Sequence, residues 1–302
     1  MTTVLIAGDE GLRTFDGGGT PGPVHLQGRA VTTFVGDRDD LWAIVDRREV
    51  WHGVGRTDWT HRATLEGHEA TSIAFTDELT VGTTEARLFQ LDGDALHPVE
   101  AFDRVEGRDA WYTPWGGPPD TRSFSEWGHD VYVNVHVGGI PRTDDGGRTW
   151  TPTIDVDADV HQVATARGLV LAACAGGLAS SADRGATWTW RTDGLEAPYS
   201  RAVVVCGDVL LLSASNGPGG SRSAVYRGSV YGDGPFDRCG GGLPEAFDDN
   251  VDTYCLDALP DDGSFAVFGT ADGRVFASED QGRTWDELAS GLPAVQRVLV
   301  FP

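Results

Sequence analysis

Three short segments of the chain, Thr143–Trp150 (TDDGGRTW), Ser181–Trp188 (SADRGATW) and Ser278–Trp285 (SEDQGRTW), share one pattern. Each reads S/T-x-D-x-G-x-T-W, and three matches at five fixed positions indicate an internal repeat. The residue types suit a tight turn between two strands. The aspartate can accept hydrogen bonds from the turn, the glycine can adopt positive φ, and the tryptophan can pack where the chain re-enters the sheet. We call these segments boxes one, two and three and expect them to be structural rather than catalytic.

Four further segments look like hairpins of the same kind with eroded boxes. Most of the seven hairpins follow two strand-like runs rich in Val, Ala, Leu and Phe and bounded by Gly and Asp, which predicts four strands in each repeat. The eroded hairpins are Leu12–Val24, Val50–His61, Leu88–Pro98 and Ser223–Asp237.

The two ends of the chain complement each other in this pattern. Only one run, Thr3–Ala7, precedes the first hairpin, and one run, Val295–Phe301, follows the last. Pairing these two runs would close the ring and satisfy strand edges that would otherwise be open. The sequence therefore predicts an all-β, seven-bladed β-propeller of four-stranded antiparallel blades, closed by the C-terminal strand joining the N-terminal blade. Residues 1–302 would form one domain with about 43 residues per blade; six blades, with one hairpin misread, is the alternative.

Charge and composition limit the partners and the compartment. The 302 residues carry 46 Asp plus Glu against 23 basic residues, a formal charge of −23, so neither nucleic acid nor a membrane is an expected partner. No stretch resembles a secretory signal or reaches the roughly 20 apolar residues of a membrane span. The four cysteines show no C-x-x-C spacing, which favours buried free thiols in a cytoplasmic protein. We expect a monomer or weak homo-oligomer.

The strand order sorts loops onto two edges of each blade. The boxes and the turns between first and second strands lie at one edge, the box edge. The turns between second and third strands and the connections between blades lie at the other, the connection edge, where loops on a rigid scaffold can carry function. The longest connection is 102–120, which contains Trp111 and Trp115. We expect a binding loop over the channel mouth with both tryptophans in contact with ligand; the alternative is a hydrophobic flap that plugs the channel.

Two histidines are expected to meet at the connection edge. His136 ends the second strand of blade four, and His161 begins the first strand of blade five. They could bind a divalent metal with Asp159, and with Gln162 or His68 completing the shell. They could equally act as a general base and its partner, or contact ligand. A histidine at a strand end can also have no role beyond hydrogen bonding.

Arginines from different blades are placed alike on this edge. Arg122 and Arg201 each lie six residues before the glycine that ends the first strand. In an acidic protein they could bind a carboxylate or phosphate through two parallel hydrogen bonds. The alternative is ion pairing with local acids such as Asp252. His68, Asn250 and Asp252 lie on the same edge and are further candidate ligand contacts.

The region from Trp111 to Pro302 resembles bacterial proteins described as WD40/YVTN/BNR-like or exo-alpha-sialidase propellers. The resembling segments include PWGGPPDTRS, VNVHVGGIPRTDDGGRTW, DADVHQV, GLEAPYSRAV, AVYRG and DDNVDT. The resemblance implies a six- or seven-bladed propeller, and sialidases hold their ligand at the edge opposite the boxes. The F/Y-R-I-P motif of true sialidases does not occur: Ile140-Pro141-Arg142 has the wrong order. Tyr199 is a candidate nucleophile, but no glutamate is obviously placed to activate it.

Two classes of function fit these observations. The first is an enzyme of glycosidase, lyase or lactonase type, although not a true sialidase. It would act on a small polar or anionic molecule, such as a sugar acid or lactone, by His-assisted acid/base chemistry with or without a divalent metal. The second is a non-catalytic propeller that binds a protein or small ligand on the same edge.

Overall fold

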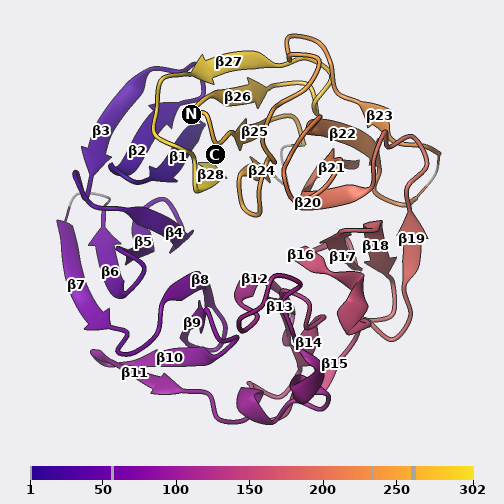
Figure 1. Ribbon diagram of the computed structural model, residues 1–302. Helices are drawn as coiled ribbons and strands as arrows, with labels where there is room; N and C mark the ends of the chain where they lie inside the picture. The colour runs from indigo at the N-terminus through magenta and orange to yellow at the C-terminus, as the bar shows by residue number, and fades with distance from the viewer. Residues whose placement is uncertain (1, 56–57, 233, 260–262) are drawn as a thin grey trace. The chain divides into compact units, whose positions relative to one another are not determined.

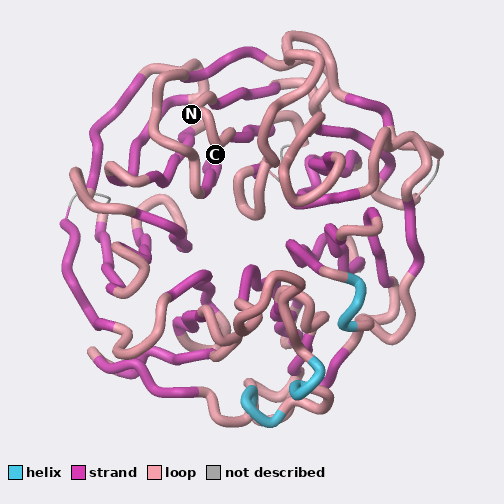
Figure 2. Tube along the Cα trace, in the orientation of Figure 1, coloured by secondary structure: helices cyan, strands magenta, loops and turns pink. Residues whose placement is uncertain are grey.

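The computed structural model describes residues 2–55, 58–232, 234–259 and 263–302. Its regular structure is almost entirely β, and the helical residues described form the three short 3-10 turns η1 (Phe102–Arg104), η2 (Arg108–Ala110) and η3 (Val156–Ala158), drawn in cyan in Figure 2. None of the described residues forms a helix long and apolar enough to cross a membrane.

The strands form seven four-stranded antiparallel sheets, the blades (Figure 1). Blade one contains β1 (Thr3–Gly8), β2 (Gly11–Asp16) and β3 (Pro21–His25). Blade two contains β4 (Val31–Gly36), β5 (Asp40–Val45), β6 (Glu49–Val54) and β7 (Asp58–Thr64). Blade three contains β8 (Ala70–Phe75), β9 (Leu79–Thr83), β10 (Leu88–Asp92) and β11 (Ala95–Pro98). Blades four and five contain β12 (Thr121–Trp127), β13 (Asp130–Val135), β14 (Pro141–Thr143) and β15 (Thr151–Pro152); β16 (Val160–Ala166), β17 (Leu169–Cys174), β18 (Gly177–Ser181) and β19 (Thr189–Arg191). Blades six and seven contain β20 (Tyr199–Cys206), β21 (Val209–Ser215), β22 (Ala224–Ser229) and β23 (Asp237–Arg238); β24 (Leu256–Ala258), β25 (Ala266–Gly269), β26 (Val275–Ser278) and β27 (Asp286–Ala289), and the remaining strand is β28 (Arg297–Phe301).

The fold is therefore the predicted seven-bladed β-propeller, and the six-bladed alternative is wrong. By the density of its contacts the chain divides into two compact units, residues 1–29, 173–179 and 190–302 in the first and residues 30–172 and 180–189 in the second. The organisation of residues 1–302 as one domain stays a prediction.

The strand shared by the two ends of the chain is present in blade one. β28 pairs antiparallel with β1 from Thr3↔Phe301 to Ala7↔Arg297, and the sheet order is β28-β1-β2-β3. Val298 and Val300 of β28 are buried in the core of the first unit together with Val4 and Ile6 of β1. The prediction that the C-terminal strand joins the N-terminal blade is confirmed.

Each box is a turn held by its own side chains, as box two illustrates. Asp183 accepts hydrogen bonds from the backbone N–H and the hydroxyl of Thr187, at 2.8 and 2.6 Å. The hydroxyl of Ser181 donates to Asp183 at 2.8 Å and accepts from the N–H of Gly185 at 2.8 Å, and Gly185 has φ 90°. The box aspartate is thus fully used in holding the turn, as expected of a structural residue.

These hydrogen bonds make box two sensitive to acid. The hydroxyl and N–H of Thr187 stabilise the ionised carboxylate and lower the pKa of Asp183 to about 2. A lowered folded-state pKa stabilises the fold above the unfolded-state pKa, and this stabilisation disappears as pH falls through the folded-state value. We expect Asp183→Asn to lower the melting temperature at pH 7 and the difference from wild type to shrink between pH 4 and pH 2. Thermal melts across this range test it, with Asp193→Asn at an exposed aspartate as control; a pH-independent difference would contradict it.

The tryptophan of box three lies deep in the first unit. Trp285 is 2% exposed, its ring lies 4.9 Å from that of Phe268, and its indole N–H donates to the carbonyl of Gly282 at 3.1 Å. The equivalent Trp150 and Trp188 are half-buried. Removing a buried tryptophan leaves a cavity that neighbouring side chains refill only in part.

We expect Trp285→Ala to lower the free energy of unfolding by about 3–5 kcal/mol. Urea denaturation monitored by circular dichroism measures it. Trp190→Ala is the matched control, since Trp190 is 48% exposed in the same unit and its removal leaves no enclosed cavity. Equal losses in the two variants would show that box three does not anchor the core.

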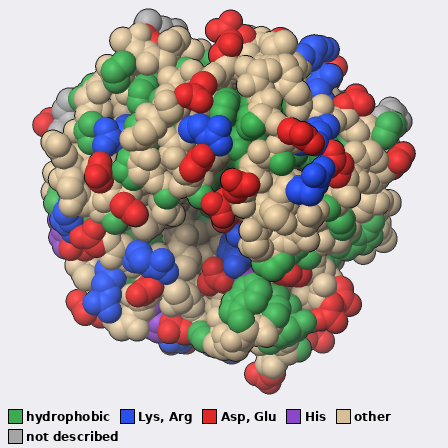
Figure 3. Space-filling view, turned by 45° about the horizontal axis from the view of Figure 1, so that its top comes forward, with side chains coloured by type: hydrophobic (Ala, Val, Ile, Leu, Met, Phe, Trp, Pro, Cys, Tyr) green, Lys and Arg blue, Asp and Glu red, His purple; other side chains and the backbone are tan. Residues whose placement is uncertain are grey.

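Acidic side chains are spread over the face shown in Figure 3, with basic side chains among them. The four cysteines are buried and form no disulfide with one another, and burial raises the pKa of the Cys239 thiol to about 12. Such thiols are poor nucleophiles at neutral pH. The cysteines are therefore not expected to be catalytic residues.

Candidate functional site

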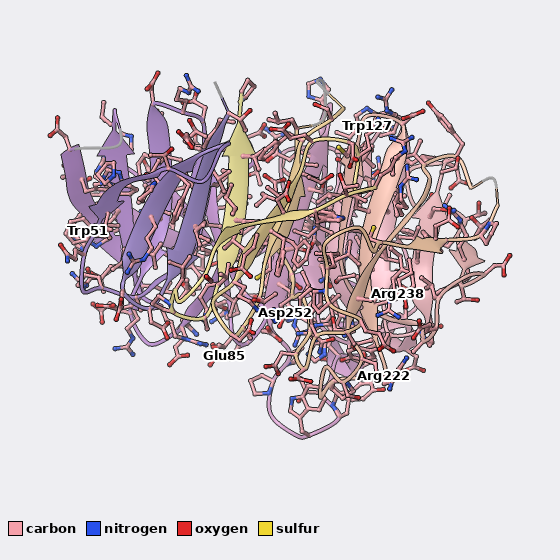
Figure 4. The ribbon with its side chains drawn as sticks, turned by 90° about the horizontal axis from the view of Figure 1, so that it is seen from above. Trp51, Glu85, Trp127, Arg222, Arg238 and Asp252 are labelled. Atoms are coloured by element: carbon pink, nitrogen blue, oxygen red, sulfur yellow. The ribbon has the colours of Figure 1, made fainter. Side chains whose placement is uncertain are left out.

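The two edges of a blade are separated as the strand order predicts. Trp127, at the end of β12, and Glu85, in the turn between β9 and β10, lie at opposite edges of the second unit in Figure 4. His136 follows β13, and Asp159 and His161 lie where the connection from blade four enters β16. All three belong to the connection edge, whereas the exposed His129, between β12 and β13, belongs to the box edge.

His136 is fixed by the turn that ends β13. Its backbone N–H donates to the carbonyl of Asp120 at 2.9 Å, where the long connection enters β12. The turn closes through a bridge between Val135 and Gly139. Gly139 has φ 75°, and a Cβ there would lie 2.7 Å from the carbonyl oxygen of Ile154, so the turn requires glycine. The His136 side chain is 1% exposed.

Asp159 and His161 are placed by the turn η3. The Asp155 side chain accepts from the N–H of Asp157 and begins the turn, and Asp159 ends it with φ 49° in the left-handed region. Two residues later His161 enters β16 and is fully buried, so the turn brings Asp159 back beside it. Aspartate is among the few residues that adopt this conformation readily.

The three side chains form one compact cluster, which we call the His–Asp–His cluster. Oδ1 of Asp159 lies 3.1 Å from Nε2 of His136 and 3.5 Å from Nε2 of His161. All three atoms lie within 4.8 Å of one another, and the imidazole centroids are 6.0 Å apart. The short contact between Asp159 and His136 lacks hydrogen-bond angles, so both buried atoms are without a hydrogen-bond partner among the described residues.

The charges around the cluster shift its ionisation. Burial by itself would lower the pKa of His136, but the carboxylates of Asp120 and Asp159 outweigh it and the pKa lies above its usual value. Burial would raise the pKa of Asp159, yet the two imidazoles hold it below its usual value. The cluster therefore favours an ionised carboxylate that faces two imidazoles.

Sequence reasoning did not single out Asp120. Its Oδ1 lies 3.5 Å from Nδ1 of His136 and its Oδ2 lies 3.3 Å from Nε of Arg122. Burial would raise the pKa of Asp120, but His136 and Arg122 lower it to about 2. Asp120 thus faces the ring nitrogen of His136 that points away from Asp159. The only signal in the sequence was its place, directly before the first strand of blade four.

Arg122 is positioned by an irregularity that recurs in the first strands. The pairing register shifts across Thr32, Thr71, Arg122 and Arg201, at a β-bulge or a similar irregularity, and each of these residues is half-buried between buried neighbours. Bulges redirect a side chain and are frequent beside active sites. Arg122 and Arg201 therefore occupy equivalent positions in their strands, as predicted. One terminal nitrogen of Arg122, NH1, is buried without a hydrogen-bond partner among the described residues.

The connection 102–120 has a packed first part and a second part beside the cluster, and its role as a binding loop or a flap stays a prediction. In the first part Phe102 is buried, and Trp111 is half-buried with its ring 5.8 Å from Phe102 and 4.7 Å from the Arg108 guanidinium. Its second part covers the cluster: Trp115 is 63% exposed, yet its ring lies 5.4 Å from that of His136. The hydroxyl of Tyr112 donates to Asp157 at 3.2 Å and ties the loop to η3.

Gly138 permits the close approach of this loop. A Cβ at Gly138 would lie 2.4 Å from Cγ1 of Val135 and 3.1 Å from the ring of Trp111. The position must therefore be glycine for Trp111 to pack beside the turn that carries His136.

The remaining predicted residues make contacts of their own. His68, in the second unit, pairs with Glu85 through a short contact to Nδ1, and its ring lies 5.3 Å from that of Phe89. Among the described His, Cys, Asp and Glu side chains, those whose ligand atoms group with His136 are Asp159 and His161, without His68. A contribution from Gln162 stays a prediction.

Tyr199, Arg201, Asn250 and Asp252 belong to the first unit. The guanidinium of Arg201 binds Asp252, with Nε 2.7 Å from the carboxylate, and also donates to the hydroxyl of Tyr199 at 3.5 Å. The amide of Asn250 accepts from Ser215 at 2.7 Å and donates to the carbonyl of Pro218, so it holds the loop after β21. The ion pair weighed as the alternative for Arg201 is present. Binding of a carboxylate or phosphate ligand by Arg201 stays a prediction.

No family model matches the chain, and no curated protein matches it in sequence. Several solved structures share its fold. A GH74 xyloglucanase from Xanthomonas campestris is 16% identical, with a TM-score of 0.71 over 95% of this chain and 52% of the xyloglucanase. The computationally designed Ika8 protein is 13% identical, with a TM-score of 0.62 over 97% of this chain and 85% of that one. YCF48 bound to D1 peptide is 14% identical, with a TM-score of 0.57 over 85% and 82%. At such identities the likeness supports the propeller fold alone.

Proposed function

We propose that the protein is an enzyme that acts on a small polar or anionic molecule, of the sugar-acid or lactone kind, at the connection edge of blades four and five. One observation carries this proposal: a single oxygen of Asp159 lies 3.1 Å from Nε2 of His136 and 3.5 Å from Nε2 of His161, although both imidazoles are buried. Burying several ionisable groups together is costly. Such groups are concentrated at functional sites.

The side chains around the cluster support the substrate class. Arg122 lies beside Asp120 with one buried terminal nitrogen still able to donate, which suits the carboxylate of a sugar acid or the carbonyl oxygen of a lactone. Trp115 offers an exposed apolar ring next to His136 on which a sugar ring can rest. The His–Asp–His cluster would supply the base that removes a substrate proton or activates a water molecule.

The three boxes support a place for the chain among BNR-repeat, sialidase-like propellers. The absence of the F/Y-R-I-P motif from the sequence argues against true sialidase activity. A proton-transfer reaction, as in lyases and lactonases, fits the histidine pair better. We also propose a cytoplasmic location and a monomer or weak homo-oligomer.

The test is turnover of a panel of uronic acids, aldonic acids and aldonolactones by the wild-type protein. We expect activity towards at least one member that Asp159→Asn abolishes and His129→Ala, on the box edge, retains. Asparagine tolerates the left-handed conformation of Asp159, so the variant keeps the turn and loses the charge. No turnover of any member, or equal turnover by Asp159→Asn, would count against the enzyme.

A non-catalytic binding propeller is the second candidate, and the burial of the cluster favours it. His136 and His161 are 1% and 0% exposed, while Trp115 is 63% exposed, so the loop presents an aromatic surface above closed-off imidazoles. Binding of a sugar acid or a peptide without turnover, weakened by Trp115→Ala and unaffected by Asp159→Asn, would support this function instead.

A further inference from the structure

We propose that His136, Asp159 and His161 bind one divalent transition-metal ion of the zinc class. The inference deepens the proposed function by naming what the His–Asp–His cluster holds. It rests on the geometry of the three side chains, and binding of an ion can be measured whether or not a substrate is turned over.

The spacing of the donor atoms fits a single ion. An ion with bonds of about 2.0–2.1 Å and tetrahedral geometry holds its ligand atoms roughly 3.3 Å from one another. The observed separations of Asp159 Oδ1 from the two Nε2 atoms, 3.1 and 3.5 Å, bracket this value, and the third separation lies within the 4.8 Å that encloses all three atoms. Three protein ligands leave a position for water or substrate, as in catalytic zinc sites.

Hydrogen bonding does not account for the shortest contact. Nε2 of His136 and Oδ1 of Asp159 are buried and 3.1 Å apart, but their angles are not those of a hydrogen bond. Buried polar atoms normally have partners, and a bound ion is one reason for an exception. A metal ion held between the two atoms would account for a short contact that is not a hydrogen bond.

Asp120 completes the arrangement as a positioning residue. A histidine that binds a metal through one nitrogen almost always donates its other ring N–H to a carboxylate or carbonyl. Oδ1 of Asp120 lies 3.5 Å from Nδ1 of His136 and favours the tautomer in which Nε2 keeps its lone pair for the ion. Arg122 brings a positive charge nearby, and the 3.3 Å contact between its Nε and Asp120 offsets that charge.

The donor types select the kind of metal. Imidazole nitrogen suits zinc, copper, iron and nickel, whereas calcium and magnesium prefer sites made of oxygen. Two imidazoles and one carboxylate therefore favour Zn²⁺ or Co²⁺ over Ca²⁺ and Mg²⁺.

The experiment titrates chelator-treated full-length protein with Zn²⁺ by calorimetry and with Co²⁺ by visible absorption. We expect one equivalent per chain and a Co²⁺ spectrum of nitrogen and oxygen ligation. Asp159→Asn and His161→Ala should each weaken binding by more than about 100-fold, and Asp120→Asn by about 10–100-fold with the stoichiometry kept. His129→Ala, an exposed histidine of blade four, should bind within about twofold of wild type, the result for a residue outside the ligand shell.

Folding is checked by the melting temperature of each variant. If His161→Ala does not fold, Asp159→Asn decides the question, since Asp159 is partly exposed and asparagine suits its backbone. Absence of Zn²⁺ binding by folded wild-type protein, or unchanged binding by folded Asp159→Asn, would overturn the metal site. Binding of several Zn²⁺ equivalents that no variant reduces would indicate binding to surface carboxylates. That result would overturn the metal site as well. Tight binding without turnover of any substrate would leave the metal site standing and refute the enzyme.

Discussion

Deletion of Ala294–Pro302 is expected to abolish cooperative folding. The deletion removes β28, in which Val298 and Val300 are 2% and 6% exposed and Phe301 is buried. It also removes the buried Val295 that precedes this strand. Four large apolar side chains at about 1.5–3 kcal/mol each amount to a loss similar to the whole stability of an ordinary domain, about 5–15 kcal/mol. The deletion also leaves the edge of β1 unpaired and open to association with other chains.

Thermal unfolding followed by circular dichroism, with light scattering for aggregation, measures this effect. Gln296→Ala is the control, because Gln296 is exposed within the deleted segment and a surface change is expected to stay within about 0.5 kcal/mol. A truncated protein that melts cooperatively at the wild-type temperature would show that β28 is dispensable for closing blade one.

His161→Ala is expected to lower turnover of the proposed substrate by roughly 10²–10⁴-fold, the range for loss of a general acid or base. The residue is fully buried beside Asp159. Its loss removes a proton-transfer group or a ligand of the proposed metal ion. Because Arg122 and Trp115 stay in place, we expect kcat to fall more than KM rises.

The two roles of His161 differ in their response to added metal. If His161 holds an ion, excess Zn²⁺ should recover part of the activity of His161→Ala, whereas the loss of a proton-transfer group would be insensitive to Zn²⁺. Val163→Ala, a buried apolar position of the same strand, is the control for disturbance of β16. Full activity of a folded His161→Ala variant would exclude both roles.

The blades could be predicted from sequence because each depends on local patterns. Alternating apolar runs, glycine at the turns and the S/T-x-D-x-G-x-T-W boxes are all read within about 40 residues. The pairing of β28 with β1 followed from counting, since one strand was missing at one end of the chain and one was spare at the other. The meeting of His136 and His161 followed from strand order alone, because the end of a second strand and the start of the next first strand share an edge.

The finer features of the site depend on contacts that no pattern encodes. Asp120 faces His136 because the long connection ends beside the turn that follows β13. His68 pairs with Glu85, which lies in the turn between β9 and β10. The ring of Trp115 lies 5.4 Å from that of His136 in a connection whose Trp111 packs close to Gly138, and neither contact has a signature in the sequence. Each of these contacts depends on tertiary packing. The residue types involved also occur in ordinary loops, so the sequence alone does not reveal the contacts.

The pairing of β1 with β28 also has a consequence for biosynthesis. Thr3–Gly8 leave the ribosome while their partner, almost the whole length of this sequence later, has not yet been translated. The nascent chain must therefore carry an incomplete first sheet with an open strand edge until residues 297–301 emerge. Contacts of such high sequence separation form slowly. During this interval the growing polypeptide is most exposed to misassembly, and a chaperone that shields strand edges would help it most.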